Sequence, residues 1–121
     1  MGTLIMAITS VIISVAAQFA LKSGMSSMEV KEALSQPATL RTILVILTNK
    51  FVISGFFLYG LGAVVWLGVL SRWDVSKAYP LVGMGFGLTV IVGLLIGEQI
   101  TISRAIGVAL ICVGVVVVGR S

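Results

Sequence analysis

The apolar residues of the chain fall into four uncharged blocks, and this arrangement limits the possible folds more than any other feature. Residues 2–21, 51–71 and 78–97 form three blocks of about 20 residues, and residues 105–119 form a shorter one. A helix of about 20 residues crosses the roughly 30 Å hydrocarbon core of a bilayer. Because arginines bound the shorter block and can extend to the interface, we interpret it as a fourth membrane helix.

The composition excludes a water-soluble globular domain. Of the 121 residues, 59% are hydrophobic and 10% are charged, whereas soluble domains carry about a quarter charged residues. We therefore expect an all-α, multi-pass integral membrane protein with a single domain over residues 1–121. The expected helices cover about 2–22, 51–71, 77–97 and 102–119, with a short interfacial helix over about 40–48.

The charged residues are mostly basic and lie at the ends of the apolar blocks. The net charge of +4 at these positions favours lipid headgroups or an anionic lipid-like ligand over nucleic acid. Five basic residues would lie on one side of the membrane and three on the other. This near balance permits insertion in both orientations, so we expect an antiparallel dimer.

The first block carries one polar stripe. Ser10, Ser14, Gln18 and Lys22 are spaced four apart and share one helix face. Such a stripe is costly against lipid, which predicts that it faces the bundle interior or a hydrated cavity. The alternative is that Ser10 and Ser14 donate to carbonyls of their own helix, which leaves Gln18 and Lys22 to explain.

Two aromatic residues of the second block share a face with two glycines. Tyr59 and Trp66 lie on the same face as Gly55 and Gly62. Aromatic side chains beside glycines can shape a cavity. They can equally be packing residues or interfacial anchors, and both readings stay open here.

Small residues recur at helix-packing intervals in the last two blocks. Gly83 and Gly87 are four apart, and Gly107 and Gly114 are seven apart. Such spacing lets helix backbones approach closely in lipid. The glycines of the third helix either pack within one subunit or face a ligand, and those of the fourth form a helix-to-helix seam, within or between subunits. Pro80 lies near the start of the third helix, where its missing N–H costs least.

Ionisable acidic groups are absent from the middle of every block. No acidic residue lies near mid-span and the chain has no histidine, so proton-coupled efflux of a cation lacks its titrating group. Lys22, Arg41 and Lys77 lie at membrane boundaries, where basic groups suit a phosphate. The competing interpretation for each is lipid anchoring. We expect no enzyme activity, cofactor or metal.

Four segments resemble the drug/metabolite transporter superfamily. They are SVAAQFALK at 14–22, SKAYP at 76–80, GE at 97–98 and GVALICVGV at 107–115. The resemblance covers nearly the whole chain. The four-helix, small multidrug resistance-like (EamA-like) members of this superfamily include multidrug exporters and the small flippase subunits for aminoarabinose linked to undecaprenyl phosphate.

The chain resembles the flippase subunits more than the exporters. The exporters carry a glutamate eight residues before a lysine in helix 1, and Ser14 occupies that position here. Resemblance to the flippase subunits implies a multi-pass protein of the cell (inner) membrane. It also implies a dimer, homodimeric or with a paralogous four-helix subunit, that moves a polyprenyl-phosphate-linked sugar between leaflets.

On this reading, each candidate residue has a hypothetical role. Lys22, with Arg41 or Lys77, would hold the phosphate. Ser14, Gln18 and Tyr59 would bind the sugar, and Trp66 would line the cavity. Tyr79, also a candidate substrate contact, would let the cavity alternate together with Pro80 and the glycines of the third helix. The alternatives are a small-molecule exporter and an accessory membrane subunit.

Overall fold

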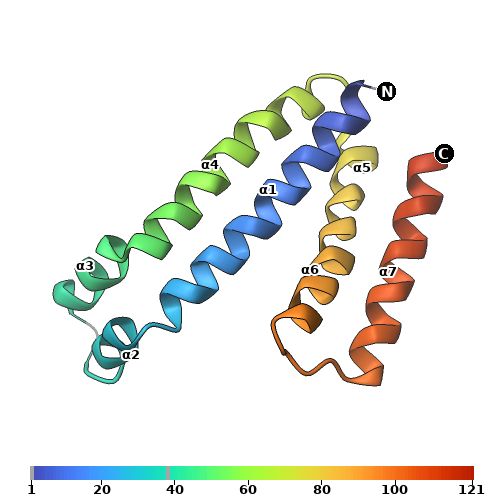
Figure 1. Cartoon of the computed structure of the whole chain (residues 1–121). Coiled ribbons are helices and arrows are strands. Elements are labelled where there is room, and N and C mark those ends of the chain that lie inside the picture. The colour runs from blue at the N-terminus through green and yellow to red at the C-terminus, as the bar shows by residue number, and fades with distance from the viewer. Residues whose placement is uncertain (1, 38) are drawn as a thin grey trace.

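The structure is a computed structural model that describes residues 2–37 and 39–121, and these residues form helices and connecting turns (Figure 1). The helices in chain order are α1 (Gly2–Met25), α2 (Met28–Leu34), α3 (Leu40–Thr48), α4 (Lys50–Leu70), α5 (Val75–Ala78), the 3₁₀ helix η1 (Tyr79–Gly83), α6 (Met84–Leu95) and α7 (Ile102–Arg120).

Four helical segments are long and apolar enough to cross a membrane. They are α1, α4, the continuous run Val75–Leu95 and α7. The expected all-α class with four candidate membrane spans is confirmed. In Figure 1, α1 and α4 form one antiparallel hairpin, and the α5–α6 run and α7 form the second.

The third span is not a uniform α-helix. Pro80 has no N–H to donate, and the chain passes through it as the 3₁₀ helix η1. At the other end α6 stops at Leu95 because Gly97 adopts a left-handed φ of 92°. The Glu98 N–H then donates to the Gly93 carbonyl at 2.8 Å, which closes the helix end in a Schellman-type turn.

Helices α1 and α4 pack so closely that a Cβ added at either of two glycines would reach the backbone of the other helix. A Cβ added at Gly24 would lie 2.9 Å from the Val52 backbone nitrogen. One added at Gly55 would lie 2.6 Å from Leu21 Cγ and 3.1 Å from the Ala17 carbonyl oxygen. These glycines therefore set the separation of the two helices, as small residues do where helices meet in lipid.

Two side chains hold the short helices α2 and α3 at one end of this hairpin. Ser27 caps α2, where its hydroxyl accepts from the Val30 N–H at 3.4 Å. Asn49 caps α4 by accepting from two backbone N–H groups, and its amide donates to Ser27 Oγ at 3.2 Å. The sequence pattern predicts a helix over 40–48, which the structure has as α3, but it does not predict α2.

Helix α7 lies at the edge of the bundle and packs mainly on η1 and α6. A Cβ at Gly83 would lie 2.8 Å from Val115, and one at Gly87 would lie 2.9 Å from Cys112 Sγ. Both glycines thus serve packing within the subunit. Gly107 and Gly114 have nothing within 4 Å of an added Cβ, so their face of α7 is open.

Candidate functional site

A cavity of about 580 Å³ lies between α1, α4 and the η1–α6 segment. Its lining residues come from three of the four spans. They are Ser10, Val11, Ser14, Val15 and Gln18 of α1, Tyr59, Gly62, Ala63 and Trp66 of α4, and Val82, Gly85, Phe86 and Thr89 of η1 and α6.

The polar stripe of α1 forms one wall of the cavity, and Ser10 also joins α1 to α4. Ser10 is 3% exposed, and its hydroxyl donates to the Gly62 carbonyl oxygen at 2.7 Å. It therefore bonds across the helix pair. The alternative interpretation of the sequence, in which Ser10 donates to a carbonyl of its own helix, is wrong for this residue. Ser14 lines the same wall one turn further along.

Gln18 and Tyr59 meet inside the cavity. The Gln18 side-chain amide donates to the Tyr59 hydroxyl, which links α1 to α4. The Gln18 side chain is exposed to the cavity and Tyr59 is half-buried. In an apolar bilayer an amide and a phenol need hydrogen-bond partners, and here they bond to each other. A ligand hydroxyl could replace either group, so this pair is suited to bind a polyhydroxylated headgroup.

The remaining walls are largely aromatic and apolar, and only some of their residues are predictable from the sequence. Trp66 is among those predicted, whereas Phe86 and Thr89 of α6 are not. Thr89 donates to the Gly85 carbonyl of its own helix at 2.6 Å. A Cβ at Gly85 would lie 3.2 Å from Val11, so the close contact of α6 with α1 brings these residues to the cavity.

No Asp, Glu, Lys or Arg occurs among the described residues that line the cavity. Its walls thus offer hydroxyl, amide and aromatic groups without a full charge. Lys22 continues the stripe one turn beyond Gln18, in the exposed last turn of α1. A charged part of a ligand is therefore matched at this end of α1, and a neutral part inside the cavity.

The other proposed ligands of a phosphate do not join Lys22. Arg41 lies on α3 and lines a separate pocket. Lys77 lies on α5, beside the first turns of α1 and so at the opposite end of the bundle from Lys22 (Figure 1). Its Nζ is 4.6 Å from the centre of the Trp73 ring, a cation–π contact typical of an interfacial anchor.

Tyr79 and Pro80 lie in η1, outside the cavity lining. The Tyr79 side chain is 67% exposed. The structure thus brings together Ser14, Gln18, Tyr59 and Trp66 of the proposed substrate contacts, with Lys22 beyond them. It leaves Arg41, Lys77 and Tyr79 elsewhere. Their roles toward a substrate stay predictions.

The fold and the cavity define a class: a small multi-pass α-helical membrane protein with a neutral, hydrogen-bonding cavity between three spans. Its charged groups lie at the ends of the helices. This arrangement is suited to hold a ligand that has both a polar and an apolar part.

Comparison with known proteins narrows this class. The chain is 47% identical over 62 residues to a probable 4-amino-4-deoxy-L-arabinose-phosphoundecaprenol flippase subunit ArnE of Pseudomonas savastanoi, over 50% of this chain and 54% of the relative. It is 39% identical over 56 residues to the probable flippase subunit ArnF of Sodalis glossinidius, which is 44% of this chain and 43% of the relative. An uncharacterized protein, y4nH, of Sinorhizobium fredii is 37% identical over 76 residues, over 61% and 64%.

The chain spans about half the length of the flippase subunits it matches. No family model matches it. No solved structure matches it either. Over the matched region the chain is a homologue of these flippase subunits, which confirms the resemblance stated from its motifs. The ArnE and ArnF relatives are named as flippase subunits, and with the four candidate spans they confirm a multi-pass location in a bacterial membrane.

Proposed function

We propose that this chain is a subunit of an inner-membrane flippase that moves a polyprenyl-phosphate-linked sugar between leaflets. The observation that carries the proposal is the uncharged cavity lined by Ser14, Gln18 and Tyr59, with Lys22 one turn beyond it on the same face of α1. The names of the relatives support the same class of cargo.

Different groups of the site bind different parts of such a cargo. Sugar hydroxyls exchange hydrogen bonds with the Gln18 amide and the Tyr59 phenol, which already bond to each other. The phosphate stays charged, so it binds the Lys22 ammonium at the end of α1 and does not enter the apolar walls. The prenyl tail remains in the surrounding lipid.

A small-molecule exporter driven by proton exchange is the less favoured alternative. Such exchange needs an ionisable group that cation and proton both reach. Ser14 occupies the position at which the exporters of this superfamily carry a glutamate, and the described cavity lining contains no carboxylate or histidine.

The proposal predicts a strong dependence of transport on Lys22. Replacing Lys22 by Ala is expected to slow flipping of the lipid-linked sugar about ten- to hundredfold, because a charge-assisted contact with the phosphate is lost. The rate is measured in reconstituted vesicles as the appearance of the headgroup to a membrane-impermeant reagent. Lys22→Arg should retain most of the rate.

Lys50→Ala is the matched control, because Lys50 begins α4 at the same end of the bundle and contacts Phe51, not the cavity. Equal rates for Lys22→Ala and Lys50→Ala would contradict the role of Lys22. No flipping by the wild-type chain, alone or with a second subunit, would overturn the proposed function.

We infer that the working unit is a dimer formed through the open face of α7. Along this helix Leu110 is 67% exposed and Val117 is 64% exposed, and Gly107 and Gly114 lie beside them with open space over each Cα. Two such faces can approach closely in lipid. The partner is a second copy or a paralogous four-helix subunit, and the antiparallel arrangement is part of this proposal.

The dimer proposal predicts that bulk at the α7 glycines disrupts association without unfolding the subunit. Gly107→Leu with Gly114→Leu is expected to raise the dimer dissociation constant about tenfold or more. The measurement is co-purification of two differently tagged copies. Gly60→Leu is the control, since Gly60 also has open space but lies on α4. Unchanged association of the double variant would contradict the interface.

A further inference from the structure

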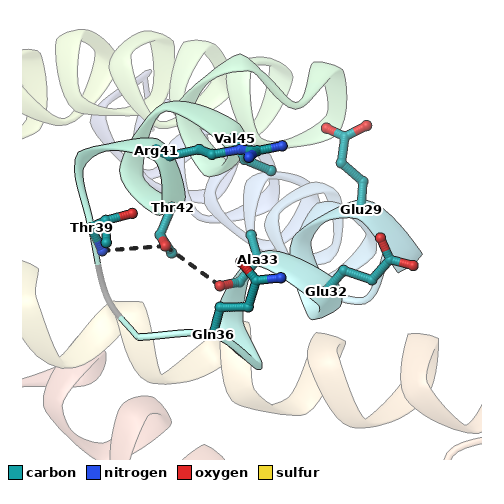
Figure 2. Close-up of a pocket in the computed structure, with 8 residues that line it drawn as sticks. All are labelled: Glu29, Glu32, Ala33, Gln36, Thr39, Arg41, Thr42 and Val45. Atoms are coloured by element: carbon teal, nitrogen blue, oxygen red, sulfur yellow. Dashed lines mark hydrogen bonds between the residues drawn. The ribbon is translucent and has the colours of Figure 1, made fainter.

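A second pocket, outside the cavity, lies between the short helices α2 and α3. It has a volume of about 210 Å³ and contains both signs of charge. Glu29 and Glu32 come from α2, and Arg41 comes from α3. In Figure 2 the Arg41 side chain extends from α3 toward the side of the pocket on which the two glutamates lie.

The pocket is held in shape by residues that do not carry its charge. Thr42 is 7% exposed; its hydroxyl donates to the Ala33 carbonyl and accepts from the Thr39 N–H, both at 3.4 Å (Figure 2). The contact between Asn49 and Ser27 fixes the far ends of α2 and α3. The pocket is thus preformed, which lowers the entropy that a ligand must lose.

The charges of the pocket do not neutralise one another. In the described part of the chain, no ion pair joins Arg41 to Glu29 or Glu32, and all three side chains are exposed. Two carboxylates and one guanidinium leave the pocket with net negative charge. It can therefore hold a cation and an anion at the same time, on different walls.

The position of the pocket relative to the bilayer follows from the apolar face of α3. Leu40, Leu44 and Leu47 lie on one stripe of this helix and are 50–72% exposed. Arg41 and Thr42 lie on the other side of the helix and line the pocket. An amphipathic helix buries such a stripe at the boundary of the acyl chains, which places its polar side at headgroup depth.

From these observations we propose that the α2–α3 pocket binds a zwitterionic lipid headgroup that carries a primary ammonium and a phosphate. Arg41 holds the phosphate, and Glu29 and Glu32 accept from the ammonium. Two lipids have this chemistry: phosphatidylethanolamine of the bilayer and a lipid-linked amino sugar. Only the second source rests on the proposed function.

The first test measures lipid preference of the purified full chain by native mass spectrometry. Phosphatidylethanolamine and phosphatidylglycerol are supplied equally, and the ratio of the two bound forms is recorded. Glu29→Gln with Glu32→Gln is expected to lower this ratio about tenfold, because the ammonium loses its charged acceptors. Arg41→Gln is expected to weaken binding of both lipids, since both carry phosphate.

Lys31→Gln is the matched control, because Lys31 lies on α2 between the two glutamates and does not line the pocket. It should keep the wild-type ratio. A wild-type ratio near one, or an unchanged ratio in the double glutamate variant, would overturn the proposal. Circular dichroism checks that the variants remain helical, and the single substitutions Glu29→Gln and Glu32→Gln replace the double variant if it unfolds.

A second arm separates the two sources. An amino sugar linked to polyprenyl phosphate is added to chain loaded with phosphatidylethanolamine, beside the same lipid with its amine acetylated. If the lipid-linked amino sugar displaces phosphatidylethanolamine and its acetylated form does not, the pocket is a cargo site. If neither displaces it, the pocket is a site for a bilayer lipid. Flipping is measured on the same preparations. Lipid preference without flipping would overturn only the proposed function, and flipping without preference would overturn only the pocket.

Discussion

Replacing Ala63 by Trp is expected to slow transport of the lipid-linked sugar strongly while the subunit remains folded. Ala63 lines the cavity from α4, between Tyr59 and Trp66, and is itself exposed. An indole at this position fills the space between α4 and α6 that a headgroup would cross. We expect flipping to be about a hundredfold slower, since pushing a well-packed side chain aside costs roughly 1–3 kcal/mol.

Val64→Trp is the control for this prediction. Val64 is the next residue of α4, is 67% exposed and does not line the cavity. A tryptophan there meets lipid and should leave the rate near the wild-type value. Both variants are measured in the same vesicle assay used for Lys22. If Ala63→Trp flips the lipid as fast as Val64→Trp, the headgroup does not pass through this cavity.

Replacing Gly24 by Val is expected to lower the stability of the subunit strongly, because this glycine lies against the backbone of α4. A Cβ at this position would lie 2.6 Å from Val52 Cγ2, 2.8 Å from Asn49 Oδ1 and 2.9 Å from the Val52 backbone nitrogen. Backbone cannot move aside as a flexible side chain can, so α1 must shift away from α4 and disturb the Asn49 cap. We expect the free energy of unfolding to fall by about 3 kcal/mol, the upper end of overpacking costs.

The measurement is reversible unfolding in detergent followed by helical circular dichroism. Gly60→Val serves as the control, since nothing lies within 4 Å of a Cβ at that position on α4. It should unfold like the wild-type protein. Equal stability of the two variants would mean that α1 and α4 separate at Gly24 without cost, against the packing described above.

Helix existence was predictable here because the bilayer leaves few alternatives. Every backbone group in hydrocarbon must be bonded within its own helix, so an uncharged run of about 20 residues becomes a span. Helix ends were less predictable. The run to residue 97 stops at Leu95 because Gly97 turns into the left-handed region. The placement of α2 beside the start of α4 involves the bond between Asn49 and Ser27, which are far apart in sequence.

The candidate site was predictable where polarity marks a helix face, and in part where aromatic residues share a face with glycines, as Tyr59 and Trp66 do. Ser14 and Gln18 stand out because polar groups against lipid are costly, and both lie on the cavity wall. Phe86 carries no such mark, since an aromatic side chain is equally suited to lipid and to a cavity. Nor could the sequence place Arg41 in a pocket apart from Lys22, because that depends on how α3 folds back against α2.

The sequence by itself determined the class of the protein: four spans, a polar stripe on α1, cations at the boundaries and the segments shared with flippase subunits. Only the tertiary structure decided which helix faces meet. It set Gly85 against α1 and Gly83 against α7, and left Gly107 and Gly114 open. The physical reason is that lipid and a neighbouring helix are equally apolar, so hydropathy distinguishes membrane from water but not helix from lipid.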